Sequence, residues 1–521
     1  MILFILFLFL FGLIVLRLLD LQLLRHSFFQ QKSMEQRTRL IELAAQRGDI
    51  FDRHGNVLAT SIDTYSVYRY KKGWLARKLS LTEAEKTAAE YPKETSVLKE
   101  KKRIYPKHDL AAQAIGFVGL DNQGLASIEL SLDEYLHGKE GRLITEGDPR
   151  GVELYGALRE LEQGEDGMNV TLTIDENIQY VAERELKAQM LKYRAESGTC
   201  IVMDVETGEI LALASKPDFD PNSYQQSASK LWHPRVVDPY EPGSTFKIFT
   251  VAAALEEGVI STETMLQARD SITVGGKVIE NAHDIDWSGK SISISKMLEE
   301  SINTGSVQVG LKLGPEKFYR KIIDFGFGEK TNFGLWGESN GIVGHWQRWN
   351  KPDIAMITFG QSIAVTPLQL ISAVSAFANE GRQIQPLLIK KIESPDGKFV
   401  KVFSQNKVRR PISTKVANEV KQLMSNVVVF GTGKPAKIEG FGVAAKTGTA
   451  QKTTAGGRGY YKDRFIASFI GFAPLNNPRL ACLVIFDDPK GTYWGATVAG
   501  PVFQKIMDYS LRYLNVKPDM L

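Results

Sequence analysis

The chain has 521 residues, of which 43% are hydrophobic, 10% aromatic and 24% charged. These proportions are typical of a folded globular protein and exclude a mostly disordered, collagen-like or polytopic membrane chain. The formal net charge of +4 gives no sign of nucleic-acid binding. The two cysteines, Cys200 and Cys482, are too few for a disulfide framework or a cysteine zinc site, and both lie in apolar runs that predict core positions.

The N-terminus is apolar. Residues 1–16 carry no charge, but at about 1.5 Å per residue they reach about 24 Å, less than a hydrocarbon core of about 30 Å. Extension to Leu24 provides the length and brings in Arg17 and Asp20, which could snorkel or face a partner helix. Because no small-x-small cleavage site follows, the sequence favours a single-pass anchor over residues 1–24 rather than a removable signal peptide.

The basic residues near this span all follow its apolar start, and none precedes it: Arg17, Arg25, Lys32, Arg37 and Arg39. The positive-inside rule alone would therefore place the body of the protein in the cytoplasm. We expect the opposite orientation, with a few basic residues preceding Met1, because of the family resemblance described below.

After the anchor, the pattern predicts a polar helical stretch to about Gln46, followed by short strands and turns such as His54-Gly55-Asn56. Residues 69–107 contain 12 basic and 5 acidic side chains. Such a stretch is either a solvated face or a contact surface for anionic lipid headgroups or an acidic partner.

A second region begins near residue 167. Asp175 is expected to cap a helix with apolar residues at helical spacing, and residues 198–214 to form a hairpin around Glu206-Thr207-Gly208. Residues 465–474 and 480–486 are predicted strands, and residues 498–513 a closing helix. Strands at both ends with helices between them indicate an α/β sandwich rather than alternating βαβ units.

Ser244 and Lys247 lie three residues apart at the start of a predicted helix, so that they share one face. A neutral lysine could accept the serine proton, provided that a nearby cation, desolvation or the helix N-terminus depresses its pKa from about 10.4. The pattern is weak by itself, because S-x-x-K recurs elsewhere in this chain.

Two further motifs follow. Ser301-Ile302-Asn303 offers a hydroxyl for proton relay and an amide that could hold a substrate carbonyl. Lys446-Thr447-Gly448-Thr449, if it lies on a strand edge, supplies a cation, two hydroxyls and a glycine that lets substrate approach the backbone. Lys446 could also be the like charge that keeps Lys247 neutral.

In this order the three motifs match those of serine enzymes that react with penicillin. The chain resembles the class B penicillin-binding proteins, and the resemblance covers nearly its whole length. The motifs that carry it are Arg47-Gly48-x-Ile50-x-Asp52-Arg53-x-Gly55, Tyr105-Pro106, Gly116-Phe117-Val118-Gly119, Leu172-Thr173-Ile174-Asp175, Gly360-Gln361, Thr366-Pro367-Leu368-Gln369 and Asn379-x-Gly381.

Within that family it looks most like the septal transpeptidase of cell division, because of Glu241-Pro242-Gly243, Asn303 and Asp487-Asp488-Pro489. One departure is Ser127, where relatives often carry glycine. The resemblance implies a transmembrane anchor (1–24), an elongated α+β pedestal domain of the dimerisation type (25–166) and a transpeptidase domain with an antiparallel sheet sandwiched by helices (167–521). It also implies that the catalytic domain faces outward from the cytoplasmic membrane, at the division septum.

The implied reaction is D,D-transpeptidation of peptidoglycan stem peptides through an acyl-serine, with β-lactams as mimics of the donor. Ser244 would be the nucleophile, Lys247 the base, Ser301 and Asn303 relay and positioning groups, and Lys446, Thr447, Gly448 and Thr449 the carboxylate-binding strand. The resemblance implies no cofactor and no metal. It also implies that the anchor and pedestal contact a polytopic glycan polymerase and other division proteins.

Several alternatives remain open. An elongation-type transpeptidase, a D,D-carboxypeptidase or a β-lactamase would use the same motifs, and a non-catalytic division scaffold or β-lactam sensor would use the anchor and pedestal instead. The segment Gly337-Glu338-Ser339-Asn340-Gly341 fits the nucleophile elbow G-x-S-x-G, but polar residues flank it and we expect a loop.

Overall fold

The computed structural model describes residues 1–43, 45–69, 72–92, 94–146, 160–283, 289–404, 408–454 and 459–520. The chain forms two compact units. The smaller unit comprises residues 1–48, 63–101 and 137–167, and the larger unit comprises residues 49–62, 102–136 and 168–521. The chain therefore passes between the units five times, and the last passage coincides with the boundary expected near residue 167.

Two segments of the expected pedestal, 49–62 and 102–136, thus belong by their contacts to the larger unit. The division of the sequence into an anchor (1–24), a pedestal domain (25–166) and a transpeptidase domain (167–521) stays a prediction.

The smaller unit begins with an exposed apolar helix. Helix α1 (Ile2–Leu19) continues into the π-helical turn η1 (Asp20–Leu24), and together they form a span of 23 residues with a mean hydropathy of 3.0. By length and composition this helix can cross a membrane. Arg17 and Asp20 pair with each other, Nη1 to Oδ2 at 2.6 Å, which reduces the cost of placing both near a membrane interface.

The next segment corrects one expectation. Helix α2 (His26–Arg37) ends nine residues before Gln46, and β1 (Thr38–Leu43) replaces the predicted helical stretch. Strand β1 pairs along its whole length with β6 (Gly141–Glu146), which in turn pairs with β7 (Glu160–Glu162). Pairing with a distant strand outweighs the local pattern, as is common for β-structure.

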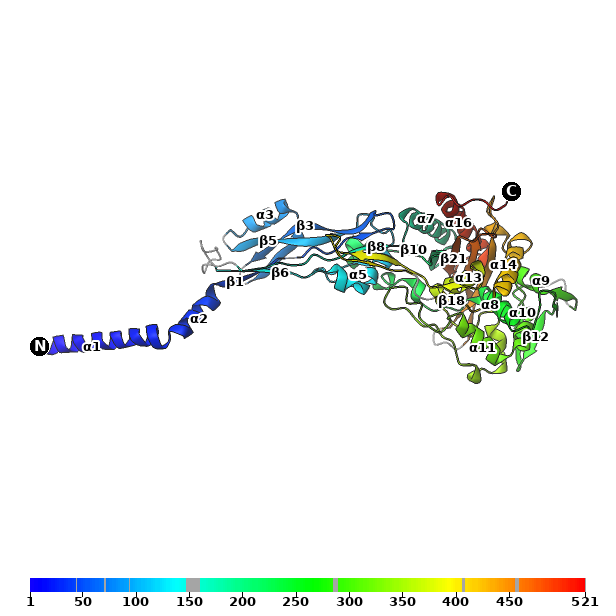
Figure 1. Ribbon diagram of the computed structural model, residues 1–521, viewed down its shortest axis with the longest axis horizontal. Helices are drawn as coiled ribbons and strands as arrows, with labels where there is room; N and C mark the ends of the chain where they lie inside the picture. Colours follow the sequence, from blue (N-terminus) through cyan, green and yellow to red (C-terminus); the bar gives the residue numbers. More distant parts are fainter. Residues whose placement is uncertain are drawn as a thin grey trace. The chain divides into compact units, whose positions relative to one another are not determined.

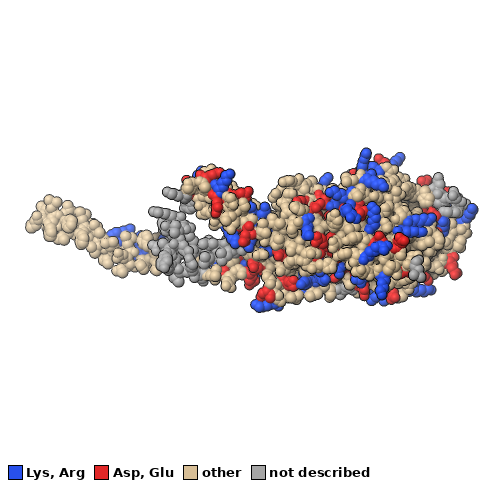
Figure 2. Space-filling model, turned by 90° about the horizontal axis from the view of Figure 1, so that it is seen from above, with Lys and Arg blue, Asp and Glu red and all other residues tan. Residues whose placement is uncertain are grey.

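Among the described residues of the basic stretch 69–107, six basic side chains form ion pairs within their own unit: Arg69, Arg77, Lys99, Lys101, Arg103 and Lys107. In the smaller unit Arg69 bonds to Glu94 at 2.7 Å, and Lys99 and Lys101 each reach Asp63 at 2.8 Å. Over the larger unit, Figure 2 shows Lys and Arg interspersed with Asp and Glu on the face in view. The contacts therefore favour the solvated-face interpretation of this stretch over a binding surface.

The larger unit contains a five-stranded antiparallel sheet in the order β10-β9-β21-β20-β19 (Figure 1). The strands are β9 (Ser197–Asp204), β10 (Ile210–Lys216), β19 (Ala444–Thr453), β20 (Tyr460–Ala473) and β21 (Leu480–Asp487). The predicted hairpin and the two late strands are thereby confirmed. Strand β19, which carries Lys446 to Thr449, is an edge strand of this sheet.

Helices cover both faces of the sheet. Alternate side chains point to opposite faces, so that Ile201 and Met203 pack with helices α8, α13 and α14, whereas Cys200 and Val202 pack with α7 and α16 (Figure 1). These helices are α7 (Glu176–Tyr193), α8 (Lys247–Glu256), α13 (Pro367–Ala378), α14 (Thr414–Val429) and α16 (Gly500–Tyr513). The predicted sandwich, the Asp175 cap and the core positions of both cysteines are confirmed.

The structure contains further strands and α-helices. They are β2 (Ile50–Phe51), β3 (Val57–Arg69), β4 (Gly73–Leu79), α3 (Leu81–Ala89), β5 (Thr95–Ile104), α4 (Ala112–Ile115), α5 (Ser127–Ser131), α6 (Asp133–Leu136), β8 (Asn169–Leu172), β11 (Met265–Gln267), β12 (Ser271–Val274), β13 (Lys277–Glu280), β14 (Ser291–Ser293), α9 (Ile294–Glu299), α10 (Asn303–Leu313), α11 (Pro315–Asp324), α12 (Lys351–Ile357), β15 (Gln383–Ile384), β16 (Ile389–Glu393), β17 (Val400–Val402), β18 (Val408–Arg409) and α15 (Gly495–Val498).

The backbone conformation of Ser127, at the start of α5, explains why glycine suits this position. Its φ of +48° lies in the left-handed region, which favours glycine. The serine is held there by a hydrogen bond from its Oγ to the carbonyl oxygen of Gln113, at 2.5 Å. The departure from the family pattern is therefore accommodated locally.

Candidate active site

Ser244 and Lys247 lie at the junction of two kinds of helix. Residues Gly243–Phe246 form a 3₁₀ turn, η5, and α8 begins at Lys247, whose backbone N–H donates to the carbonyl oxygen of Ser244. In a 3₁₀ turn, residues three apart are eclipsed. The two side chains therefore share one face, as the spacing predicted.

Glycines let this turn approach the rest of the unit closely. Gly243 has a φ of +59°, and a Cβ on Gly360 would lie 2.2 Å from the Gly243 carbonyl oxygen. A Cβ on Gly448 would lie 2.2 Å from Ser468 Oγ and 2.8 Å from Thr245 Cγ2. The backbone on both sides of Ser244 is thus seated directly against β19 and the loop after α12.

Lys247 is completely buried and contacts the second motif. Its Nζ donates to Asn303 Oδ1 at 2.8 Å, to Ser301 Oγ at 3.2 Å and to the Ser301 carbonyl oxygen. Ser301 lies between α9 and α10 and has a φ of +57°, a conformation that is costly for a serine and typical of functional sites. The second motif is therefore held against the first by three contacts of one amine.

Lys446 reaches the same hydroxyl from the edge of the sheet. It is also fully buried, and its Nζ donates to Ser301 Oγ at 3.0 Å and to Thr447 Oγ1 at 3.2 Å. Burial, and secondly the charge of Lys446, hold the pKa of Lys247 well below its usual value. Burial also lowers the pKa of Lys446, to about 7. Desolvation and a like charge, the two causes expected from the sequence, are therefore both present.

Two cavities flank Ser244. One has a volume of about 420 Å³, the other about 310 Å³, and Ser244, Thr449 and Trp494 line both. Ser301 and Thr447 line the smaller cavity, and Asn303 the larger. All the predicted site residues are therefore brought together, with Gly448 contributing the close approach described above.

The cavity walls include residues that the motifs did not reveal. Tyr460, Tyr493 and Trp494 line the larger cavity, and Thr432 Oγ1 lies 3.1 Å from Thr447 Oγ1. The Tyr493-Trp494 pair after Asp487-Asp488-Pro489 was the available signal for two of them, since adjacent aromatic residues in a polar loop often mark a binding site.

Glu241 stabilises the loops behind this wall. Its Oε1 accepts hydrogen bonds from Tyr460 Oη at 3.1 Å and from the Ser362 backbone N–H at 3.0 Å. Burial raises the pKa of Glu241 to about 7. This residue thus ties the start of β20 and the turn at Ser362 to the segment that precedes Ser244.

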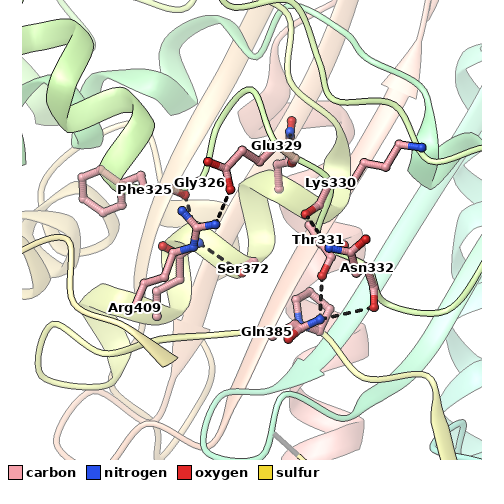
Figure 3. A pocket seen from close by; sticks show the side chains of 12 residues that line it. Phe325, Gly326, Glu329, Lys330, Thr331, Asn332, Ser372, Gln385 and Arg409 are labelled. Atoms are coloured by element: carbon pink, nitrogen blue, oxygen red, sulfur yellow. Dashed lines mark hydrogen bonds and ion pairs between the residues drawn. The ribbon is translucent and has the colours of Figure 1, made fainter. Parts of the chain in front are cut away.

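A third, smaller cavity of about 60 Å³ lies elsewhere in the larger unit (Figure 3). Several of its polar groups are engaged with one another: Arg409 pairs with Glu329, and Gln385 Nε2 donates to the carbonyl oxygen of Thr331 at 2.8 Å. None of the predicted site residues lines it, and its size suits bound water rather than a substrate.

The G-x-S-x-G segment is a loop, as expected, with no strand before it and no helix directly after it in residues 330–345, which the structure describes throughout. The Glu338 carboxylate accepts from the backbone N–H groups of Thr331 and Asn332, at 2.6 and 2.9 Å, and so has a structural role. In the described part of the chain, no group of three or more His, Cys, Asp or Glu side chains could hold a metal ion.

Comparison with known proteins agrees with this geometry. Residues 198–508 match the model of the penicillin binding protein transpeptidase domain. The chain is 34% identical over 98% of its length to stage V sporulation protein D of Bacillus subtilis, covering 86% of that protein, and 34% identical over 81% of its length to the peptidoglycan D,D-transpeptidase FtsI of Escherichia coli, covering 69%. The crystal structure of penicillin-binding protein 3 of Mycobacterium tuberculosis superimposes with a TM-score of 0.76 at 29% identity, over 92% of this chain and 99% of that one. The protein therefore belongs to the penicillin-binding transpeptidases, and within them to class B.

Proposed function

We propose that this protein cross-links peptidoglycan as a D,D-transpeptidase through an acyl-enzyme on Ser244. The observation that supports this most strongly is the convergence of Lys247 and Lys446 on the Ser301 hydroxyl beside Ser244. Relatives named as peptidoglycan D,D-transpeptidases, and solved relatives in complex with aztreonam and ampicillin, point to the same chemistry.

In the proposed reaction, Ser244 Oγ attacks the carbonyl carbon of the penultimate D-Ala of a donor stem peptide, and its proton passes to neutral Lys247. The backbone N–H groups of Ser244 and Thr449 stabilise the oxyanion. The terminal D-Ala leaves after it receives a proton, and Ser301 serves as the relay between the two lysines. Lys446, Thr447 and Thr449 bind the donor carboxylate, and Asn303 orients the donor amide.

The test is mass spectrometry of the full chain in detergent after incubation with a penicillin. A stoichiometric, slowly released adduct on Ser244, absent from Ser244→Ala, is the expected result. Rapid loss of the adduct would identify a β-lactamase instead, and an adduct elsewhere, or none, would refute the assignment of the nucleophile.

The finer role that we propose is septal cross-linking during cell division, with the larger unit outside the cytoplasmic membrane and α1 as its single-pass anchor. The apolar span Ile2–Leu24 and the similarity to FtsI support this, whereas the similarity to the sporulation protein supports the alternative of a spore-specific role. Depletion in growing cells should cause filaments that lack septa; normal division with defective spores would favour the alternative.

We further propose that the anchor contacts a polytopic glycan polymerase and other division proteins. The support is the apolar span Ile2–Leu24, which is not buried against the rest of the described chain. Replacement of the anchor by an unrelated membrane helix should then abolish co-purification of these partners.

A further inference from the structure

The larger cavity beside Ser244 is bounded by two strand edges. Thr449 and Gln451 of β19 lie on one side, and the six consecutive residues 277–282, which include β13, lie on the other. Successive side chains of a strand point to opposite faces. A cavity that six consecutive residues line therefore meets the strand along its hydrogen-bonding edge.

The hydrogen-bond phase of the β12–β13 hairpin shows which backbone groups form that edge. A two-residue turn, Gly275-Gly276, connects Val274 with its partner Lys277. The backbone N–H and C=O groups of Lys277 and Ile279 consequently point inward to β12. The backbone N–H and C=O groups of Val278 and Glu280 point outward, away from β12. Two contacts agree with this phase: the Asn281 N–H donates inward to Asp270 O, and Glu280 O accepts from Asn303 Nδ2 at 2.9 Å.

The outer edge of β13 therefore offers the N–H and the carbonyl of Val278 and the N–H of Glu280 to the cavity. No described residue pairs with β13 on this side, and the Val278 side chain is 56% exposed. An unpaired edge in a cavity is suited to an extended peptide, which it binds by adding a strand.

Transpeptidation requires two peptides at one serine. The donor, in the mechanism proposed above, places its carboxylate against Lys446, Thr447 and Thr449 on the β19 side. The second peptide must reach the acyl carbonyl from elsewhere, and the β13 edge is joined to the site by the bond from Asn303 to Glu280 O.

The charges at the two ends of β13 also fit the second peptide. Lys277 and Glu280 are both exposed and line the cavity, about 10 Å apart along an extended strand. A stem peptide that supplies its side-chain amine carries an ammonium group and a C-terminal carboxylate. One cation and one anion on the strand complement those two groups.

We propose that the outer edge of β13 binds the acceptor stem peptide as an added strand and presents its side-chain amine to the acyl-enzyme. This rests on the proposed transpeptidase function. In the step, the amine nitrogen forms a bond to the acyl carbonyl carbon, the carbon–Oγ bond to Ser244 breaks, and the amine proton passes through Lys247 to Ser244 Oγ.

The test separates acylation from aminolysis. The full chain in detergent is acylated by an N-acyl-D-alanyl thioester, and its transfer to lysine- or meso-diaminopimelate-containing tetrapeptides is measured against transfer to free D-alanine and against hydrolysis. Val278→Pro removes one outward N–H at a position where an edge strand tolerates proline. Thr273→Pro is the matched control, because Thr273 faces Val278 in the hairpin and directs its N–H to the opposite edge.

Val278→Pro should reduce transfer to the tetrapeptides about tenfold, as expected for the loss of one peptide hydrogen bond in a cavity. Acylation and transfer to D-alanine should stay within about twofold of the unmodified protein, as should every rate of Thr273→Pro. Unchanged transfer to the tetrapeptides would overturn the proposal, and so would an equal loss of acylation and transfer.

A second measurement covers the case in which Val278→Pro does not fold. Val278→Cys and Thr273→Cys are labelled with a bulky maleimide after folding, which the buried Cys200 and Cys482 do not accept. Only the label at position 278 should block transfer to the tetrapeptides, and equal rates for both labelled proteins would overturn the proposal. Failure of the thioester to acylate the unmodified protein would instead refute the transpeptidase function.

Discussion

Ser301 is the residue on which both buried lysines converge. Its left-handed backbone costs of the order of 1–3 kcal/mol, yet it places one hydroxyl 3.2 Å from Lys247 Nζ and 3.0 Å from Lys446 Nζ. Two amines that share one acceptor cannot both be charged at low cost. The position of Ser301 thus favours a neutral Lys247, which can accept a proton.

Replacement of Lys446 by Met should move the pH dependence of acylation. In the proposed mechanism acylation requires neutral Lys247, so that its rate should rise with pH and level off above the pKa of that amine. Because the charge of Lys446 adds to burial in lowering the pKa of Lys247, its removal should shift the midpoint to higher pH. Stopped-flow measurement of the rate of penicillin acylation from about pH 5 to about pH 10 would show this shift.

A midpoint unchanged in Lys446→Met would contradict the electrostatic role, even if the rate fell. Lys446→Arg is the matched control, because it keeps a cation at the strand edge. In that variant the midpoint should stay closer to that of the unmodified protein than in Lys446→Met.

The convergence of the three motifs could be predicted at this scale, since residue types and order are sequence properties. The dependence of Lys247 on Lys446 could also be anticipated, because a base must be neutral. The conformation of Ser301 and the contacts of Tyr460 with Glu241 could not, because they depend on tertiary packing between segments about 55 to more than 200 residues apart.

The absence of a side chain at Gly448 determines how closely strand β19 approaches its neighbours. A Cβ on Gly448 would lie 2.2 Å from Ser468 Oγ on the neighbouring strand and 2.8 Å from Thr245 Cγ2. The edge strand and the 3₁₀ turn of Ser244 can therefore approach each other only where no side chain intervenes.

Gly448→Ala should consequently lower the free energy of unfolding by about 1–3 kcal/mol, as overpacking does, and slow penicillin acylation. Urea unfolding and acylation kinetics would measure the two effects. Ser468→Ala removes the nearer clashing atom, so that the double variant should recover part of both losses. Additive effects of the two substitutions would contradict the steric explanation.

At the scale of elements, strong periodic patterns were predicted well. The Asp175-capped helix, the hairpin at Glu206-Thr207-Gly208 and the two late strands agree with the structure. The expected closing helix, residues 498–513, is confirmed as α16 (Gly500–Tyr513). Strand β1, in contrast, replaces the end of a predicted helix, since it depends on a partner strand about 100 residues away.

At the scale of the whole molecule, the two units are built from alternating segments of the chain rather than from one continuous segment each. Segments 49–62 and 102–136 of the larger unit contribute to the same core cluster as the sheet and helices after residue 168. Phe117, for example, stacks on Tyr224 with centroids 4.0 Å apart and contacts Phe219 edge-on. The motif Gly116-Phe117-Val118-Gly119, one of those that carry the family resemblance, thus contributes to the core of the larger unit.

A fragment of residues 167–521 should for this reason be much less stable than the full chain. Loss of buried side chains such as Ile50, Leu58, Phe117, Ile128 and Leu136 costs about 1.5–3 kcal/mol each, in total comparable with the net stability of a typical domain. The midpoint temperature of thermal unfolding and the rate of penicillin acylation should both be lower for the fragment than for the full chain. A fragment as stable and as reactive as the full chain would contradict this description of the core.

The interleaving also constrains how the protein is made. Synthesis proceeds from the N-terminus, so that residues 49–62 and 102–136 emerge long before the strands that cover them. Contacts of such long sequence separation form slowly, and side chains such as Ile50 and Phe117 stay exposed until β8 and the residues Phe219 and Tyr224 have been synthesised. A cell that makes this protein therefore needs to protect those two early segments from aggregation until these partners have emerged.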